Sequence, residues 1–230
     1  MMLLSTPGLV LHTTPYSESS VVAKVFTRQL GLRSYVIKGV RGRSGRVKQN
    51  LLQPLSSLDM VVYDNPKTDL NYVKELSPRH PGYDPNPVAN ALRFFFTEVL
   101  YKALREAEPM PALWDYVDLV ESQPAASPHT PILFFLTVAR HMGVEPMDNY
   151  SPREPYFDLQ EGHFVSAPAE ATLTLALSSI LHMYLSSEKP CAVSLQERTD
   201  LLNALIAYFQ LHLSGFSHFH SHEILHSILK

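Results

Sequence analysis

Residues 9–40 read LVLHTTPYSESSVVAKVFTRQLGLRSYVIKGV, in which segments rich in Val, Phe, Tyr, Ile and Thr alternate with polar turns. β-Branched and aromatic residues favour strands, and Leu30-Gly31 is typical of a tight hairpin connection. Five short strands within about 80 residues indicate a small closed or partly closed β-barrel of the OB type. We expect these strands at residues 9–14, 20–29, 32–40, 55–63 and 69–75.

A proline-rich segment follows the predicted barrel. Residues 77–87 read SPRHPGYDPNP and hold four prolines and one glycine. Neither a helix nor a central strand accepts that composition. We therefore expect a domain boundary near residue 80, with an OB-fold domain at residues 1–80 and a second domain at residues 81–230.

The second part of the chain has helical spacing. Asn86 followed by Pro87 is typical of a helix start, and apolar residues then recur every three or four positions along one face. Further helices are expected at residues 111–121, 128–142, 167–186, 194–213 and 221–229, with a small hairpin at 156–165. The predicted fold class is α+β in a multi-domain chain: a five-stranded barrel followed by an all-helical domain.

The charge is unevenly distributed along the chain. The whole chain has a formal net charge of −3, but residues 1–80 carry 11 Lys and Arg against 5 Asp and Glu, a balance of +6. Residues 81–230 carry 8 against 17, a balance of −9. Such asymmetry suggests an acidic partner for the first part, and nucleic acid is the commonest acidic partner.

The basic residues concentrate in one stretch of the predicted barrel, where no acid occurs between Glu18 and Asp59. Guanidinium groups and glycine N–H groups in the segment GVRGRSGRVK, residues 39–48, can follow phosphates without reading sequence. Phe26 and Tyr35 could stack bases, although core positions are commoner for such rings. The candidate DNA-binding residues are Lys24, Arg28, Arg33, Lys38, Arg41, Arg43, Arg46 and Lys48.

Signals for catalysis are weak. The chain contains no G-x-x-x-x-G-K-[ST], G-x-G-x-x-G, H-E-x-x-H or G-x-S-x-G motif, and its single cysteine, Cys191, has no recognisable nucleophile context. Five histidines near the C-terminus raise the hypothesis of a metal site. A catalytic zinc site normally adds a carboxylate or other third ligand, and the sequence shows no obvious one. An exposed, pH-sensitive cluster is the favoured interpretation for His212, His218, His220, His222 and His226. We expect no enzyme activity, no cofactor and no metal.

Targeting signals are also weak. The N-terminus has no basic segment before its apolar residues, and no run reaches about 18 apolar residues. We therefore expect a cytoplasmic protein without a membrane span.

The order of several motifs resembles the RecO family of bacterial recombination mediators. In the first part these motifs are the Pro15–Ser19 turn, Phe26-Thr27-Arg28, Gly31, Lys38-Gly39-Val40-Arg41 and Leu52-Gln53-Pro54. The likeness continues through FFFTEVLYKALREAEPMPALWDYV at residues 94–117, Arg140-His141-Met142-Gly143 and the closing LSGFSHFHSHEIL. Each motif is weak alone, but together they extend over nearly the whole chain.

The resemblance implies an OB-fold joined to a helical domain, and a binding function without turnover. Its implied ligands are single- and double-stranded DNA and the C-terminal tail of single-strand DNA-binding protein (SSB). With RecR, such a protein would anneal complementary strands and assist RecA loading in the RecF pathway, at the nucleoid. An SSB tail needs a cation and an apolar groove, for which the candidates are Phe134, Phe135 and Arg140.

The chain departs from the family at the hairpin. Many family members carry four cysteines around a Phe-Asp-x-x-x-Gly hairpin, whereas this chain keeps Phe157, Asp158 and Gly162 without those cysteines. We therefore expect a degenerate zinc-finger-like hairpin near residues 153–166, without zinc and held by packing alone. Near the C-terminus, His220 and His222 stand where relatives commonly have Lys or Arg.

Two other functions remain open. The first is an RNA-binding OB module with a helical protein-interaction domain, since the sequence shows no reader of the 2′-hydroxyl. The second is a metal-dependent hydrolase built on the C-terminal histidines.

Overall fold

The computed structural model describes residues 2–40, 50–65, 67–80, 86–104, 108–122, 127–186 and 193–221. Its contacts group the chain into two compact units, residues 1–125 and residues 126–230. The described residues of the first unit therefore include helices in addition to the barrel. The expected domain boundary near residue 80 stays a prediction, because contacts alone do not test which part folds independently.

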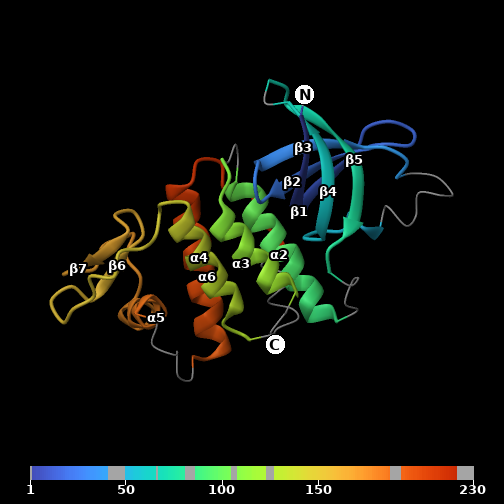
Figure 1. Cartoon of the computed structure of the whole chain (residues 1–230). Coiled ribbons are helices and arrows are strands. Elements are labelled where there is room, and N and C mark those ends of the chain that lie inside the picture. Colours follow the sequence, from blue (N-terminus) through green and yellow to red (C-terminus); the bar gives the residue numbers. More distant parts are fainter. Residues whose placement is uncertain are drawn as a thin grey trace. The chain divides into compact units, whose positions relative to one another are not determined.

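The first unit is built on a closed five-stranded barrel with the strand order β1-β2-β3-β5-β4 (Figure 1). Only β3 and β5 pair in parallel, through residues 34–36 and 70–72, and the other neighbours are antiparallel. This confirms the predicted OB-type barrel. The strands are β1 (Met2–Pro15), β2 (Val21–Thr27), β3 (Gly31–Ile37), β4 (Ser57–Asp64) and β5 (Leu70–Pro78).

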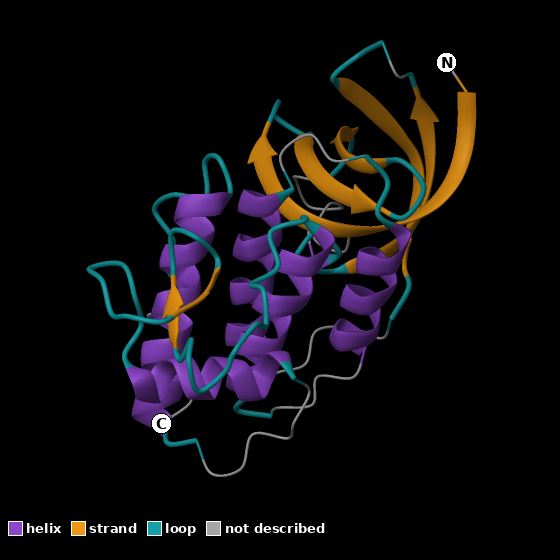
Figure 2. Cartoon of the chain, turned by 90° about the vertical axis from the view of Figure 1, so that its left-hand side faces the viewer, coloured by secondary structure: helices purple, strands orange, loops and turns teal. Residues whose placement is uncertain are grey.

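Alternating side chains fill the barrel. Val25, Tyr35 and Met60 belong to one buried apolar cluster from three different strands, as expected where successive strand residues face opposite sides. Gly8 on β1 lets the strands approach closely, since a Cβ there would lie 2.5 Å from a methyl carbon of Val25. Figure 2 shows how strongly the barrel strands curve.

The first unit also contains the helices α2 (Pro87–Ala103) and α3 (Pro111–Ser122). The Asn86 side chain accepts a hydrogen bond from the Val88 N–H at 2.9 Å, which confirms the predicted cap. Trp114 on α3 is fully buried, and its indole N–H donates to the Phe26 carbonyl on β2 at 2.9 Å. This bond joins α3 to the barrel.

The second unit is helical with one small hairpin. Its described elements are α4 (Thr130–His141), β6 (Tyr156–Asp158), β7 (His163–Val165), α5 (Leu175–Leu185) and α6 (Leu195–His212). Helices α4 and α6 pack through Phe135 and Phe209, whose ring centroids lie 4.6 Å apart. Ser194 and Glu197 form the predicted capping box of α6. The helix expected at residues 221–229 lies outside the described residues except for Ser221.

One helix boundary was predicted wrongly. The helix expected to begin at residue 167 begins at Leu175, after the Thr174 cap. Residues 171–173 instead bond to the hairpin, where the Leu159 N–H donates to the Ala171 carbonyl at 3.0 Å and the Leu173 N–H to the Phe157 carbonyl at 2.8 Å. These long-range bonds outweigh the local helical pattern.

Packing is not the only support of the β6–β7 hairpin. The Asn149 side-chain amide donates to the Phe164 carbonyl at 2.9 Å and accepts from the Phe164 N–H at 2.7 Å. The Phe157 N–H donates to the Ser178 hydroxyl at 2.9 Å. Gly162 makes the predicted turn at φ +73°, with the Tyr208 hydroxyl beside it. The expectation of packing alone is therefore corrected.

In the described part of the chain, no helix is both long and apolar enough to cross a membrane.

Candidate nucleic-acid interface

The predicted basic stretch divides into a described half and a half outside the structure. Lys24 lies on β2, Arg28 in the β2–β3 turn, Arg33 on β3 and Lys38 just after β3. The other four candidates, Arg41, Arg43, Arg46 and Lys48, lie outside the described residues. The strands and their turn thus place four of the eight predicted cations on the barrel.

Lys24 is associated with an aromatic side chain. Its ammonium nitrogen lies 5.4 Å from the centroid of the Tyr101 ring on α2, a distance within the range of cation–π attraction. The exposed His12 ring, opposite Lys24 in the β1–β2 register, lies 5.0 Å from the same Tyr101 ring. These three side chains form a cationic aromatic group on the β1–β2 side of the barrel.

Lys38 borders a groove of about 630 Å³ lined by residues of β1, β3, β4 and β5. Its ammonium nitrogen lies 5.5 Å from the centroid of the Tyr72 ring. Asp59 and Glu75 also line this groove, and Glu75 pairs with Lys74 at 3.4 Å. The groove therefore mixes both signs of charge, whereas the sequence run from Lys24 to Lys48 contains cations alone.

Arg28 makes a two-pronged ion pair that the sequence did not reveal. Its Nε and Nη2 atoms donate to the two carboxylate oxygens of Asp115 on α3, at 2.7 and 2.9 Å. The side chains remain 41% and 50% exposed. Hydrogen bonding to Asp115 raises the pKa of Arg28, and the same bond lowers the pKa of Asp115. Both groups therefore stay charged at neutral pH.

Asp115 is the first of three acids on one face of α3, followed by Asp118 and Glu121 at intervals of three residues. Asp118 accepts hydrogen bonds from the Ser57 hydroxyl at 2.6 Å and Arg79 Nε at 3.3 Å, and lies 3.0 Å from His80 Nε2. The set Asp115, Asp118 and Glu121 is called the α3 acidic row below. Its three-residue spacing was the signal in the sequence that could have identified it.

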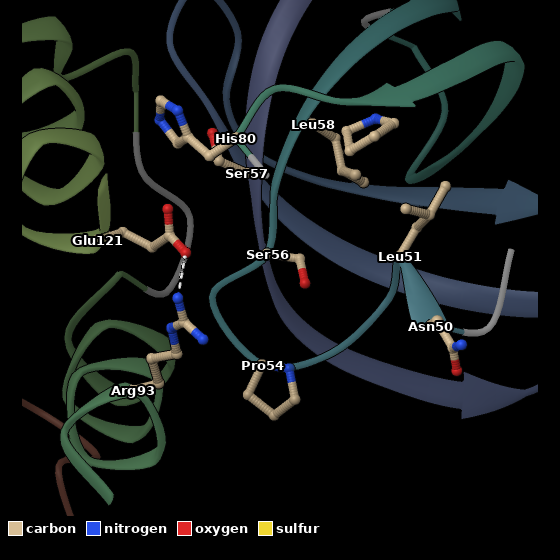
Figure 3. Close-up of a pocket in the computed structure, with 10 residues that line it drawn as sticks. Asn50, Leu51, Pro54, Ser56, Ser57, Leu58, His80, Arg93 and Glu121 are labelled. Atoms are coloured by element: carbon tan, nitrogen blue, oxygen red, sulfur yellow. Dashed lines mark hydrogen bonds and ion pairs between the residues drawn. The ribbon is translucent and has the colours of Figure 1, made fainter. Parts of the chain in front are cut away.

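The last acid of the row is buried. Glu121 accepts a hydrogen bond from Arg93 of α2 at 2.9 Å, and the two side chains are only 8% and 12% exposed. Figure 3 shows this pair beside a cavity of about 50 Å³, which Asn50, Ser57 and His80 also line. Burial raises the pKa of Glu121, against the opposing effect of the Arg93 charge.

Removing the cation from this buried pair should be costly. We expect Arg93→Met to lower the free energy of unfolding by roughly 3 kcal/mol at pH 7, because a buried carboxylate loses its charge partner. The loss should shrink as the pH falls toward 5, since a carboxyl with a raised pKa gains its proton more readily in the folded state. Urea unfolding at both pH values measures this effect.

The matched control for that variant is the double replacement Arg93→Met with Glu121→Leu. It removes both charges and should recover most of the lost stability. Equal instability of the single and double variants at pH 7 would contradict this account of the pair.

The predicted stacking rings are buried. Phe26 and Tyr35 are both 0% exposed. Tyr35 belongs to the barrel core, and the Phe26 backbone carbonyl accepts the Trp114 indole hydrogen bond. A ring without an exposed face cannot stack on a base, so the core interpretation holds and the stacking hypothesis is corrected. Two other rings lie beside predicted DNA-binding cations, Tyr101 beside Lys24 and Tyr72 beside Lys38.

Comparison with known proteins gives a consistent result. The family model described as "Recombination protein O N terminal" matches residues 1–81, which include the whole barrel. A protein named DNA repair protein RecO, from Porphyromonas gingivalis, is 30% identical over 243 residues, with 99% of each chain covered. The chain belongs to the RecO family. Proteins of the same name from Christiangramia forsetii and Phocaeicola vulgatus are 27% and 28% identical, with 97–99% of each chain covered.

The RecO resemblance had suggested an SSB-tail site at Phe134, Phe135 and Arg140. Both phenylalanines are 0% exposed, and Phe135 makes edge contacts with Phe209 and Phe216. They belong to the core of the second unit and do not line a groove, which corrects that part of the hypothesis. Arg140 is exposed and pairs with Glu145 at 2.6 Å, and its proposed role stays a prediction.

The C-terminal histidines are only partly described. His212 Nε2 lies 2.8 Å from the Leu159 carbonyl, beside the hairpin. His222 and His226 lie outside the described residues. Within the described ranges no three His, Cys, Asp or Glu side chains come together in a way that could hold a metal ion.

Proposed function

We propose that this protein is a recombination mediator that binds single- and double-stranded DNA without sequence preference and anneals complementary strands. With RecR it would assist RecA loading on SSB-coated DNA, at the nucleoid. Its RecO family membership and the name of its relatives, DNA repair protein, support this proposal. The function is one of binding, without catalytic turnover.

The observation that carries the proposal is the basic stretch of the OB-type barrel. Eight cations lie between Lys24 and Lys48, and no acid occurs between Glu18 and Asp59. Cations that contact backbone phosphates give affinity for any sequence. A surface that neutralises phosphates on two strands lowers their mutual repulsion, so that complementary strands can pair.

A strand-annealing assay on SSB-coated DNA tests the proposal. We expect the full-length protein to accelerate annealing of complementary strands without nucleotide or metal, and DNA affinity to fall steeply as salt rises. Annealing at the uncatalysed rate, together with a salt-independent affinity, would overturn it. RNA of the same sequence is the competitor: stronger binding to RNA than to DNA would favour the RNA-binding alternative.

A further inference from the structure

The bidentate contact between Arg28 and Asp115 has the geometry of an arginine–phosphate contact. Two parallel N–H groups of one guanidinium donate to two oxygens of one anion, at 2.7 and 2.9 Å. Arginine uses the same planar fork for carboxylates and for phosphates. The Asp115 carboxylate thus occupies the place that a phosphodiester oxygen pair would take on Arg28.

The Asp115 pair is one of several contacts between α3 and the barrel. The preceding residue, Trp114, contacts the barrel through its hydrogen bond to the Phe26 carbonyl. Asp118 accepts a hydrogen bond from the hydroxyl of Ser57, the first residue of β4. These two contacts are buried or half-buried. The Arg28 pair, in contrast, is open to solvent on both sides of the contact.

Exposure decreases along the α3 acidic row. The side chains of Asp115, Asp118 and Glu121 are 50%, 13% and 8% exposed. Exposed ion pairs contribute little to stability and are weakened by salt, whereas buried pairs are costly to break. Asp115 is therefore the member of the row that a competing anion can most easily displace.

We propose that Arg28 and Asp115 form a phosphate-exchange site, in which the Asp115 carboxylate holds Arg28 until a DNA phosphate replaces it. This inference rests on the proposed DNA-binding function and deepens it. Because Arg28 is occupied in the free protein, binding of a phosphate must first break the pair and then overcome the nearby negative charge. Asp115 thus weakens DNA binding while it keeps the guanidinium in position.

The test is a gain of affinity in Asp115→Asn of the full-length protein. One additional phosphate contact steepens the salt dependence for single strands by about 0.7 in log–log slope. We therefore expect the variant to bind single-stranded oligonucleotides about five- to tenfold more tightly at 50 mM salt, with a gain that vanishes toward 1 M salt. Fluorescence anisotropy with labelled oligothymidylate measures both.

Glu108→Gln is the matched control, because it removes one exposed carboxylate from the connection between α2 and α3. It should change affinity less than twofold. In an Arg28→Gln background, Asp115→Asn should no longer increase DNA affinity. That result would show that the gain depends on the Arg28–Asp115 pair.

The outcomes separate this inference from the proposed function. If the wild type binds DNA but Asp115→Asn binds no more tightly than Glu108→Gln, the exchange site is wrong and Asp115 is a structural brace. If the wild type and all variants fail to bind DNA, the proposed function itself fails.

Discussion

Replacing Arg41, Arg43 and Arg46 together by glutamine should weaken duplex DNA binding about 500-fold at 0.1 M salt. Each lost phosphate contact removes about 0.9 from the log–log salt slope for duplex DNA and about 0.7 for single strands. The slope should therefore fall by about 2.7 for duplex and about 2 for single-stranded DNA. Titrations at several salt concentrations measure both quantities, and the wild type and variant should converge toward 1 M salt.

The control for this triple variant neutralises three cations elsewhere in the chain, Lys67, Arg153 and Lys230. It makes the same change in net charge and should leave the slope nearly unchanged. A triple arginine variant with the wild-type slope would show that residues 41–46 do not contact DNA. The strand-annealing rate should fall in parallel with affinity.

Trp114→Ala should lower the free energy of unfolding by about 4 kcal/mol, the usual range for deleting a buried aromatic side chain. The Trp114 side chain is 1% exposed, and Arg79 lies over its ring, with the guanidinium carbon 5.7 Å from the centroid. The substitution leaves a large cavity and removes the indole N–H that donates to the Phe26 carbonyl. Urea unfolding monitored by far-UV circular dichroism gives the change.

Trp114→Phe separates the two contributions, since it keeps an aromatic ring but removes the indole N–H. It should cost roughly 1 to 3 kcal/mol, for the lost indole hydrogen bond and the smaller ring. If Trp114→Ala cost less than about 1 kcal/mol, α3 would not be anchored to the barrel by this side chain.

Local signals predicted much of the fold. The Asn86 cap, the Ser194–Glu197 capping box and the Gly162 turn depend on neighbouring residues, and the structure has all three. The start of α5 was predicted wrongly because the Leu159–Ala171 and Phe157–Leu173 backbone bonds connect segments that are distant in sequence. Local periodicity carries no information about such bonds.

The candidate site was harder to predict because its contacts are long-range. Charge alone identified Arg28 as a surface cation, but its partner Asp115 lies 87 residues later. Phe26 follows Val25 on β2, and alternation points the two side chains to opposite faces, yet both are buried. A strand pattern cannot show that both faces of a strand will be covered in the folded protein.

The strand order of the barrel has a consequence for its synthesis. The last strand, β5, lies between β3 and β4 and supplies the single parallel pairing. A growing chain that ends before Leu70 therefore has two unpaired strand edges, on β3 and on β4, which are templates for association with other chains. Closure must wait until β5 has left the ribosome, so the interval before its emergence is when the nascent protein is most prone to aggregate.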